Sequence, residues 1–180
     1  YTRRHRVVFN SIWDLPFGKN QKFVKAGVLS YIIGGWSIST FGVLQTGRYY
    51  SPSFSTYDPS NTGTSGGRPD RIGNGNLSDP TIAMWFDKNA FRVPGDVDGD
   101  GKPDVQVGRF GNSGVNILRG PGTRSMNAGF FKAFHLREKW RLQAEATFTN
   151  VFNHPNFGIP NTTINSGAGG LITQTQNQQY

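Results

Sequence analysis

The sequence predicts an all-β fold of antiparallel strands, interrupted by one long loop. Three observations predict it: a composition rich in glycine and aromatic residues, stretches in which apolar and polar residues alternate, and a central region of loop-forming residues. The 180 residues include 24 glycines and 10 prolines, and aromatic residues make up 13% while all hydrophobic residues reach only 35%. This composition is typical of strands and loops.

The clearest strand is expected over residues 140–149. Every second residue from Trp140 to Phe148 is apolar, and the residues between them are polar. This period of two is that of a strand, and the length matches the roughly 9 to 11 residues of a membrane-spanning strand. A less regular alternation over 127–136 precedes it, and residues 137–139 are predicted to form the hairpin turn between the two.

Two more strands are expected near the start of the chain. Residues 7–15 alternate and end at a turn over 16–20, and residues 36–45 alternate more weakly. The stretch 25–33 between them fits either a short helix or an extended turn. Single-chain barrels begin at about eight strands, so about four strands cannot close one. Residues 1–180 are therefore predicted to be a single partial β-barrel segment.

Residues 51–125 are predicted to form a long loop insertion, because Gly, Pro, Ser, Asn and Asp dominate them. Outer-membrane barrels join their strands by short periplasmic turns and long external loops in alternation, and the chain follows this order. No apolar run approaches the roughly 18 residues of a membrane helix. The pattern favours antiparallel strands of an outer-membrane-type β-barrel with one long external loop. An extracellular β-sandwich or β filament module remains the alternative, because its half-buried strands alternate in the same way.

Several short motifs follow one another along the chain: DLPFGK at 14–19, GGW at 34–36, QTGR at 45–48, RPD at 68–70, WFD at 85–87, AF at 90–91, RGPG at 119–122 and NVFNHPNFG at 150–158. Together they resemble the C-terminal barrel region of TonB-dependent outer-membrane receptors, in the Oar-like group that often carries a carboxypeptidase-regulatory-like domain. The resemblance implies a β-barrel in the outer membrane of a Gram-negative bacterium. It also implies import of a ligand, powered by a separate inner-membrane complex.

The resemblance places a plug domain, a TonB-contacting box and a signal peptide upstream of these residues. The chain begins at Tyr1 without an initiator Met, and its polar end at 176–180 does not resemble the usual closing strand with a terminal aromatic residue. We therefore expect it to be part of a longer protein, whose N-terminal region contacts the inner-membrane complex. Unpaired sheet edges would otherwise favour a homo-oligomer.

An Asp-rich stretch in the loop is predicted to bind Ca²⁺. Carboxylates stand at positions 1, 3, 5 and 9 and a glycine at position 6, an arrangement that surrounds a calcium ion with oxygen ligands. The backbone carbonyl of the residue at position 7 would add another oxygen. The alternative is a solvated Asp/Gly-rich turn without a metal. The expected ligands are Asp96, Asp98, Asp100, Lys102 and Asp104.

The four tryptophans are expected to have two roles. Trp13, Trp36 and Trp140 lie at ends of predicted strands, which fits the aromatic girdle of a barrel at the membrane interface. Trp85 lies in the long loop and is expected to anchor the core of that loop, with contact to a ligand as the alternative.

The net charge of +8 favours an anionic partner. The basic residues are mostly dispersed and form no phosphate-binding loop, which argues against nucleic acid and leaves outer-membrane lipid and lipopolysaccharide. Three histidines far apart in sequence, no hydrolase-type serine motif and no cysteine argue against an enzyme. The sequence thus predicts part of an outer-membrane receptor or transporter. The alternative is a self-assembling, structural or adhesive extracellular β subunit.

Overall fold

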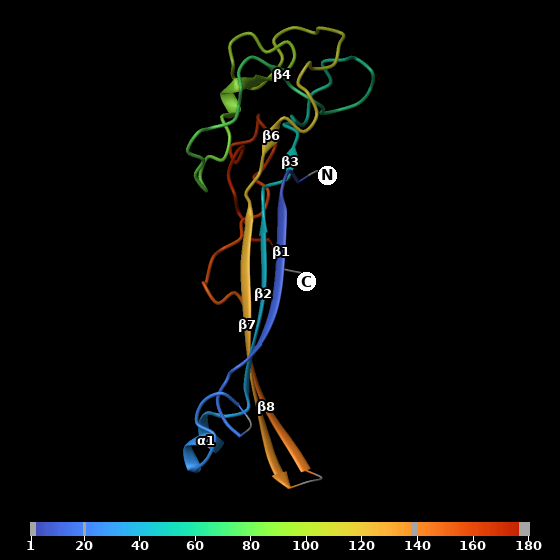
Figure 1. The fold of residues 1–180 in the computed structure, drawn as a ribbon. Coiled ribbons are helices and arrows are strands. Elements are labelled where there is room, and N and C mark those ends of the chain that lie inside the picture. The colour runs from blue at the N-terminus through green and yellow to red at the C-terminus, as the bar shows by residue number, and fades with distance from the viewer. Residues whose placement is uncertain (1–2, 20, 138–139, 177–180) are drawn as a thin grey trace. The chain divides into compact units, whose positions relative to one another are not determined.

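The computed structural model describes residues 3–19, 21–137 and 140–176 (Figure 1). The chain forms two compact units. The first, here called the sheet unit, comprises Arg6–Gln45 and Thr123–Pro155. The second, here called the loop unit, comprises Tyr1–His5, Thr46–Gly122 and Asn156–Tyr180. Residues 51–122 of the loop expected over 51–125 thus lie in the loop unit, whereas residues 123–125 belong to β7 of the sheet unit, so the predicted end of the loop is three residues too late.

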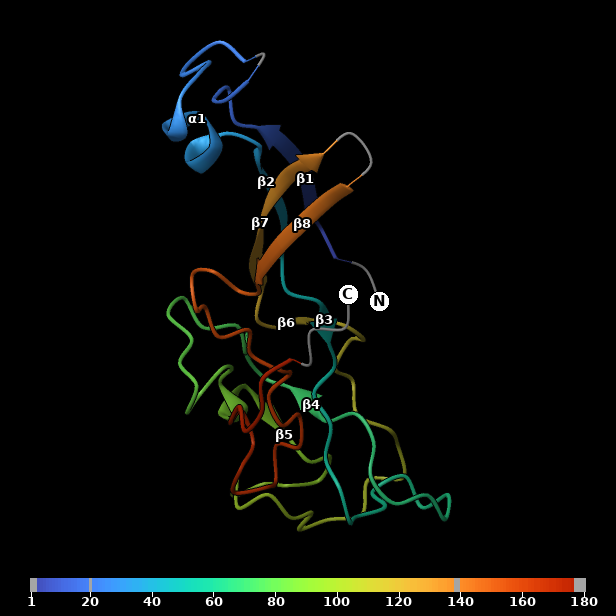
Figure 2. The same cartoon turned by 90° about the horizontal axis from the view of Figure 1, so that it is seen from below.

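The sheet unit contains a four-stranded antiparallel sheet with the strand order β1-β2-β7-β8 (Figure 2). Its strands are β1 (Arg6–Asp14), β2 (Trp36–Gln45), β7 (Thr123–Arg137) and β8 (Trp140–Phe148). The predicted antiparallel all-β architecture is therefore confirmed. Of the hairpin turn predicted over 137–139, Arg137 belongs to β7 and the other two residues lie outside the described ones.

Strand β7 begins four residues before the predicted stretch at 127. Its first residues pair with the last residues of β2, from Thr123 opposite Gln45 to Met126 opposite Gly42. This pairing supplies backbone hydrogen bonds that do not depend on alternation of the side chains. The charged Arg124 therefore lies within a strand although it interrupts the apolar pattern.

A short helix, α1 (Val28–Ile33), lies between β1 and β2. The structure thus adopts the helical alternative for residues 25–33. Gly27, with φ of 86°, precedes the helix, and the Gly34 N–H closes its last turn on the Ser30 carbonyl at 3.0 Å. Within the described residues, no helix has the length and hydrophobicity needed to cross a membrane.

The loop unit packs around a hydrophobic core. Two short antiparallel pairs, β3 (Tyr49–Tyr50) with β6 (Leu118–Arg119) and β4 (Asp70–Arg71) with β5 (Phe91–Arg92), and the 3-10 helix η1 (Lys88–Ala90) contribute to it. Among the described residues, the largest fully buried side chains are Phe86 and Leu118, which are 1% and 0% exposed. The buried cluster consists of Tyr50, Phe54, Phe86, Ala90, Phe91, Val93, Leu118 and Ile164.

Candidate functional site

The four-stranded sheet has one predominantly apolar face. Directly opposed residues of antiparallel strands have their side chains on the same side of the sheet, so the register assigns each side chain to a face. We call this side the apolar face. It carries Val7, Phe9, Ser11 and Trp13 of β1; Trp36, Ile38, Thr40, Gly42 and Leu44 of β2; Arg124, Met126, Ala128, Phe130, Lys132 and Phe134 of β7; and Trp140, Leu142, Ala144, Ala146 and Phe148 of β8.

The opposite face is mixed, and most of its residues are polar. Arg141, Gln143, Glu145 and Thr147 of β8 all lie on it. Near one end of the sheet, the Ser37 hydroxyl donates to the Asp14 carboxylate at 2.6 Å. The apolar residues of this mixed face are Val8, Ile12, Phe41, Val43, Phe131 and Ala133.

Large side chains of the apolar face are exposed in this chain. Trp13 and Trp140 are 68% and 72% exposed, and Leu142 and Phe148 are also exposed. An extended apolar surface of this kind is rare on a monomer in water. Contact with the hydrocarbon of a bilayer would remove such a surface from water. The alternation of apolar and polar residues along these strands is that of a transmembrane barrel wall.

Three polar side chains of the apolar face, those of Ser11, Thr40 and Lys132, are paired with polar groups. The hydroxyls of Ser11 and Thr40, which face each other on β1 and β2, lie 2.7 Å apart and share a hydrogen bond. Lys132 is only 5% exposed. Its ammonium donates to the carbonyls of Tyr31, Ile32 and Gly34 at 3.0, 2.5 and 2.8 Å.

Lys132 was not identified as important from the sequence. The only sign of it there is that a lysine interrupts the apolar row of its strand. The ammonium also lies over two aromatic rings of the same face, 5.0 Å from the ring centroid of Trp36 and 5.1 Å from that of Phe134. These cation–π contacts and the three carbonyls together compensate the desolvation of the charge.

The three tryptophans predicted at the membrane interface all lie on the apolar face and toward the same end of the sheet. Trp13 is the penultimate residue of β1, and Trp36 and Trp140 are the first residues of β2 and β8. The Trp36 indole N–H donates to the Ile32 carbonyl at 3.1 Å. The chain connects β1 to β2 at this end through α1, whereas residues 46–122 connect β2 to β7 at the other end.

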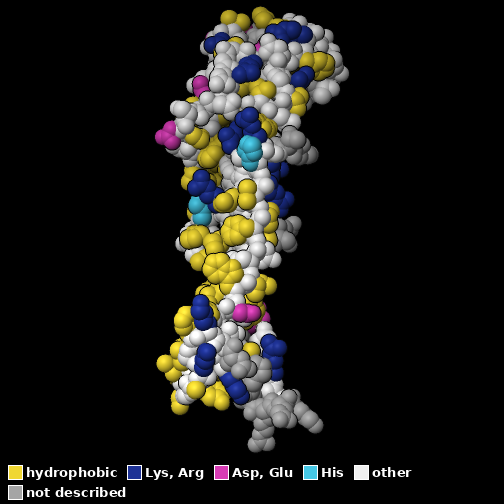
Figure 3. Space-filling view, in the orientation of Figure 1, with side chains coloured by type: hydrophobic (Ala, Val, Ile, Leu, Met, Phe, Trp, Pro, Cys, Tyr) yellow, Lys and Arg dark blue, Asp and Glu magenta, His cyan; other side chains and the backbone are white. Residues whose placement is uncertain are grey.

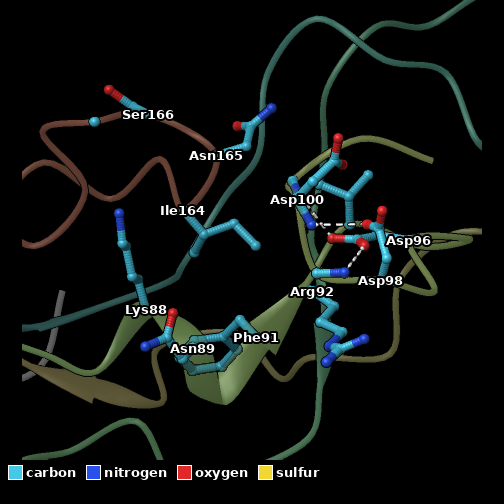
Figure 4. Close-up of a pocket in the computed structure, with 14 residues that line it drawn as sticks. Lys88, Asn89, Phe91, Arg92, Asp96, Asp98, Asp100, Ile164, Asn165 and Ser166 are labelled. Atoms are coloured by element: carbon cyan, nitrogen blue, oxygen red, sulfur yellow. Dashed lines mark hydrogen bonds between the residues drawn. The ribbon is translucent and has the colours of Figure 1, made fainter. Parts of the chain in front are cut away.

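The Asp-rich stretch of the loop unit brings three of the predicted calcium ligands together. Carboxylate oxygens of Asp96, Asp98 and Asp104 lie within 4.8 Å of one another. The Asp96 carboxylate accepts hydrogen bonds from the backbone N–H groups of Gly99 at 2.6 Å and Gly101 at 3.1 Å. Figure 4 shows Asp96 and Asp98 close together beside an open cavity of about 430 Å³ that Asn165 and Ser166 also line.

The other two predicted ligands form an ion pair with each other. The Lys102 ammonium lies 3.1 Å from the Asp100 carboxylate, and both side chains are exposed. The hydrogen bond from Lys102 lowers the pKa of Asp100, and the same bond raises the pKa of Lys102. The Asp104 carboxylate accepts from the Val97 N–H at 2.7 Å, so backbone donors and a lysine currently satisfy much of this acidic loop.

Trp85 lies at the edge of the loop core and not at its centre. It is half-buried, and its indole N–H donates to the Arg119 carbonyl at 2.9 Å. The central position belongs to the next residue, Phe86, whose ring packs edge-on against Tyr50 and Phe91. The bonded indole holds β6 against this segment, and contact of Trp85 with a ligand stays a prediction.

One family model, described as an outer membrane beta barrel domain, matches residues 1–179. No curated protein matches the chain, and no solved structure matches it. The family match confirms the fold class predicted from the alternating strands. It also agrees with the division of the sheet into an apolar face and a mixed face.

Proposed function

Since the chain belongs to the outer membrane β-barrel domain family and resides in the bacterial outer membrane, we propose that it is the wall and external loop of a receptor that imports a ligand. In this proposal the apolar face of the sheet lies against lipid, and the mixed face lines the lumen. The edges of the sheet, β1 and β8, pair with further strands of the closed barrel.

The observation that carries the receptor proposal is the ordered insertion between two neighbouring wall strands. The last residue of β2, Gln45, lies opposite the first residue of β7, Thr123. A tight turn would suffice to join two strands in this register. Instead the chain inserts Thr46–Gly122, which shares a packed core with Ile164 from the C-terminal part. A loop with its own core offers a fixed surface for recognition.

The two ends of the sheet differ in a way that supports one orientation. The connection from β1 to β2 and the one from β7 to β8 leave the end that carries the three tryptophans, and they are the shorter ones. Short connections are periplasmic in bacterial barrels, and long ones are extracellular. We therefore assign the tryptophan end to the periplasmic side and the connection over residues 46–122 to the cell exterior.

Lipopolysaccharide is the proposed lipid partner at the external end. Arg124 lies on the apolar face, one residue from the external end of β7. An apolar groove of about 330 Å³ borders it, lined also by Phe9, Leu44, Met126 and Phe152. A guanidinium next to an apolar groove suits a lipid that combines phosphate groups with acyl chains.

Ca²⁺ is the proposed ligand of the acidic loop. Asp96, Asp98 and Asp104 already have carboxylate oxygens within 4.8 Å of one another, and a hard cation requires such a group of oxygens. The Asp100 carboxylate and the backbone carbonyl of Lys102 would complete the set of calcium ligands once the ion pair between the Asp100 and Lys102 side chains opens. The ion would stabilise the loop and would not take part in catalysis, since we propose no enzymatic role.

A comparison of spent growth medium tests the receptor proposal. Bacteria carrying the intact full-length protein are compared with bacteria lacking residues 51–118 and with bacteria whose inner-membrane energising complex is inactivated. Because an inactive complex leaves the barrel unaltered, this strain separates import from folding. The proposal predicts at least one compound that only the intact strain removes from the medium. Identical media, together with lost adhesion or self-assembly in the loop deletion, would instead support a structural surface subunit.

A further inference from the structure

We propose that residues 16–19 and 21–34, here called the anchor segment, insert their apolar side chains into the periplasmic leaflet of the outer membrane. The inference rests on the orientation given above, in which the tryptophan end of the sheet is periplasmic. The anchor segment contains α1 and belongs to the sheet unit. The anchor segment would bind phospholipids at the boundary between their headgroups and acyl chains.

Helix α1 has its polar and apolar sides reversed relative to a helix of a water-soluble protein. Ser30 of this helix is polar but buried, with only 7% of the residue exposed. Its hydroxyl donates to the Gly27 carbonyl at 2.8 Å. By contrast, Val28 and Tyr31 are 76% and 74% exposed. Exposed apolar side chains on the anchor segment comprise Phe23, Val28, Leu29, Tyr31 and Ile32. This reversal is expected where the surroundings are lipid.

Close backbone packing holds the helix in this orientation. A side chain on Gly18 would bring its Cβ within 2.7 Å of the Gly34 Cα, so only glycine permits this approach. The ring centroids of Phe17 and Phe23 lie 6.0 Å apart, so the two rings pack against each other before α1 begins. The buried side of α1 is therefore occupied by backbone, and its apolar side chains point away.

Contacts with Lys132 place α1 on the lipid side of the sheet. The side chains of Lys132 and Trp36 both belong to the apolar face, and both donate to the Ile32 carbonyl. The last carbonyls of any helix lack partners within the helix. Hydrocarbon offers no donor to them, and Lys132 supplies one from the sheet. The anchor segment is thus continuous with the membrane-facing surface.

The charge of the anchor segment matches the headgroups of anionic phospholipids. Lys19, Lys22 and Lys25 are exposed, and the sequence of residues 15–35 contains no acidic residue. Basic residues near an anionic membrane surface are attracted to its headgroups. Figure 3 shows hydrophobic and basic side chains gathered over the anchor segment, where Figure 1 labels α1. Apolar side chains flanked by lysines are the pattern of interfacial segments.

Fluorescence quenching tests this proposal in the full-length protein. The 180 residues contain no cysteine, so Tyr31→Cys, Ala144→Cys and Ile72→Cys each introduce one site in this chain for an environment-sensitive dye. The labelled proteins are reconstituted in vesicles of phosphatidylethanolamine and phosphatidylglycerol. The acyl chains carry bromine either near the headgroup or near the bilayer centre, and iodide is the aqueous quencher.

The dye at position 31 should be quenched by bromine near the headgroup and protected from iodide. Phosphatidylglycerol carrying the bromine should quench it more strongly than brominated phosphatidylethanolamine, and replacing Lys19, Lys22 and Lys25 by Gln should remove this difference. The dye at exposed Ile72 of the loop unit should respond only to iodide.

Quenching of position 31 by iodide would overturn the proposal, because the segment would then face water. Protection from both quenchers would also overturn it and would indicate coverage by protein, such as a second copy. Ala144, on the apolar face of β8, distinguishes this failure from failure of the barrel. Quenching at 144 by either brominated lipid with none at 31 rejects only the anchor, whereas no lipid quenching at either site also rejects the proposed membrane orientation.

Discussion

The ring of Phe9 covers Gly42 on the neighbouring strand. The two residues face each other in the pairing of β1 with β2, and a Cβ built on Gly42 would overlap the Cζ and Cε1 atoms of the Phe9 ring. Glycine therefore provides the space in which the aromatic side chain lies flat on the sheet. This contact fixes part of the apolar face next to the groove that Phe9 and Leu44 line.

Replacement of this glycine should destabilise the barrel. Gly42→Val displaces the Phe9 ring, and such overpacking costs about 1 to 3 kcal/mol. Urea unfolding in lipid vesicles measures the change. Ala146→Val on exposed β8 is the matched control and should have little effect. Combining Gly42→Val with Phe9→Ala should recover part of the loss, and equal destabilisation with and without the ring would contradict this account.

The hydrogen bond between Ser11 and Thr40 should behave as a coupled pair. Ser11→Ala leaves the Thr40 hydroxyl without its partner on the apolar face, and we expect destabilisation of about 1 kcal/mol. Ser11→Ala combined with Thr40→Val removes both polar groups and should cost less than the sum of the two single changes. A double-mutant cycle should give a coupling energy of about 0.6 kcal/mol, as for hydrogen bonds within membranes. Strict additivity of the two single changes would show that the pair is not desolvated.

The ion pair between Asp70 and Arg109 should make the loop unit sensitive to acid. Two guanidinium nitrogens lie 2.8 Å from the two Asp70 oxygens, and the hydrogen bond from Arg109 is the main cause that lowers the pKa of Asp70. A folded-state pKa below the unfolded value of about 3.9 means that ionised Asp70 stabilises the fold above that value. This contribution is lost as pH falls through the lowered pKa.

Limited proteolysis between pH 7 and pH 2 measures this dependence. Arg109→Gln should make the loop unit easier to cleave at pH 7 and should weaken the additional effect of acid. Asp79→Asn, a change at an exposed carboxylate of the same unit, should leave the acid profile unaltered. Identical profiles for wild type and Arg109→Gln would show that the pair does not stabilise the loop unit.

Calcium should bind the loop unit weakly and through particular aspartates. Titration calorimetry of the intact protein in detergent should give a dissociation constant of about 10⁻⁴ to 10⁻³ M, the range of extracellular calcium modules. Asp98→Asn and Asp104→Asn should each abolish the heat, whereas Asp79→Asn should retain it. Lys102→Gln should tighten binding several-fold, because it removes a positive charge and releases Asp100. Heats that are equal in all variants, or absent in all, would reject the calcium site.

Local patterns in the sequence predicted the wall strands well. Strand β2 has the predicted limits of 36 and 45, and β8 ends one residue before the predicted limit. Side-chain alternation succeeds here because each strand is exposed to a different environment on either face. The sequence did not indicate the start of β7. Thr123 belongs to the strand because it pairs with Gln45, which lies 78 positions earlier in the chain (123 − 45 = 78).

Long-range packing limited the prediction of the loop unit. Leu118 and Ile164 belong to the same core, although Leu118 precedes β7 and Ile164 follows β8 in the sequence. No periodic pattern within a short stretch of sequence indicates such a contact. Spacing placed Asp96, Asp98 and Asp104 correctly near one another. It could not show that Asp100 pairs with Lys102, because the choice of partner depends on side-chain conformation.

The orientation of the sheet is tested most directly by the accessibility of spin labels along β8. Single cysteines are placed at positions 143 to 146 of the full-length protein in lipid vesicles. Collision rates with oxygen, which concentrates in lipid, are compared with those of a water-soluble nickel complex. High oxygen accessibility at positions 144 and 146, alternating with lower values at 143 and 145, is the predicted result. Uniform values, or the opposite alternation, would contradict a membrane-facing apolar surface.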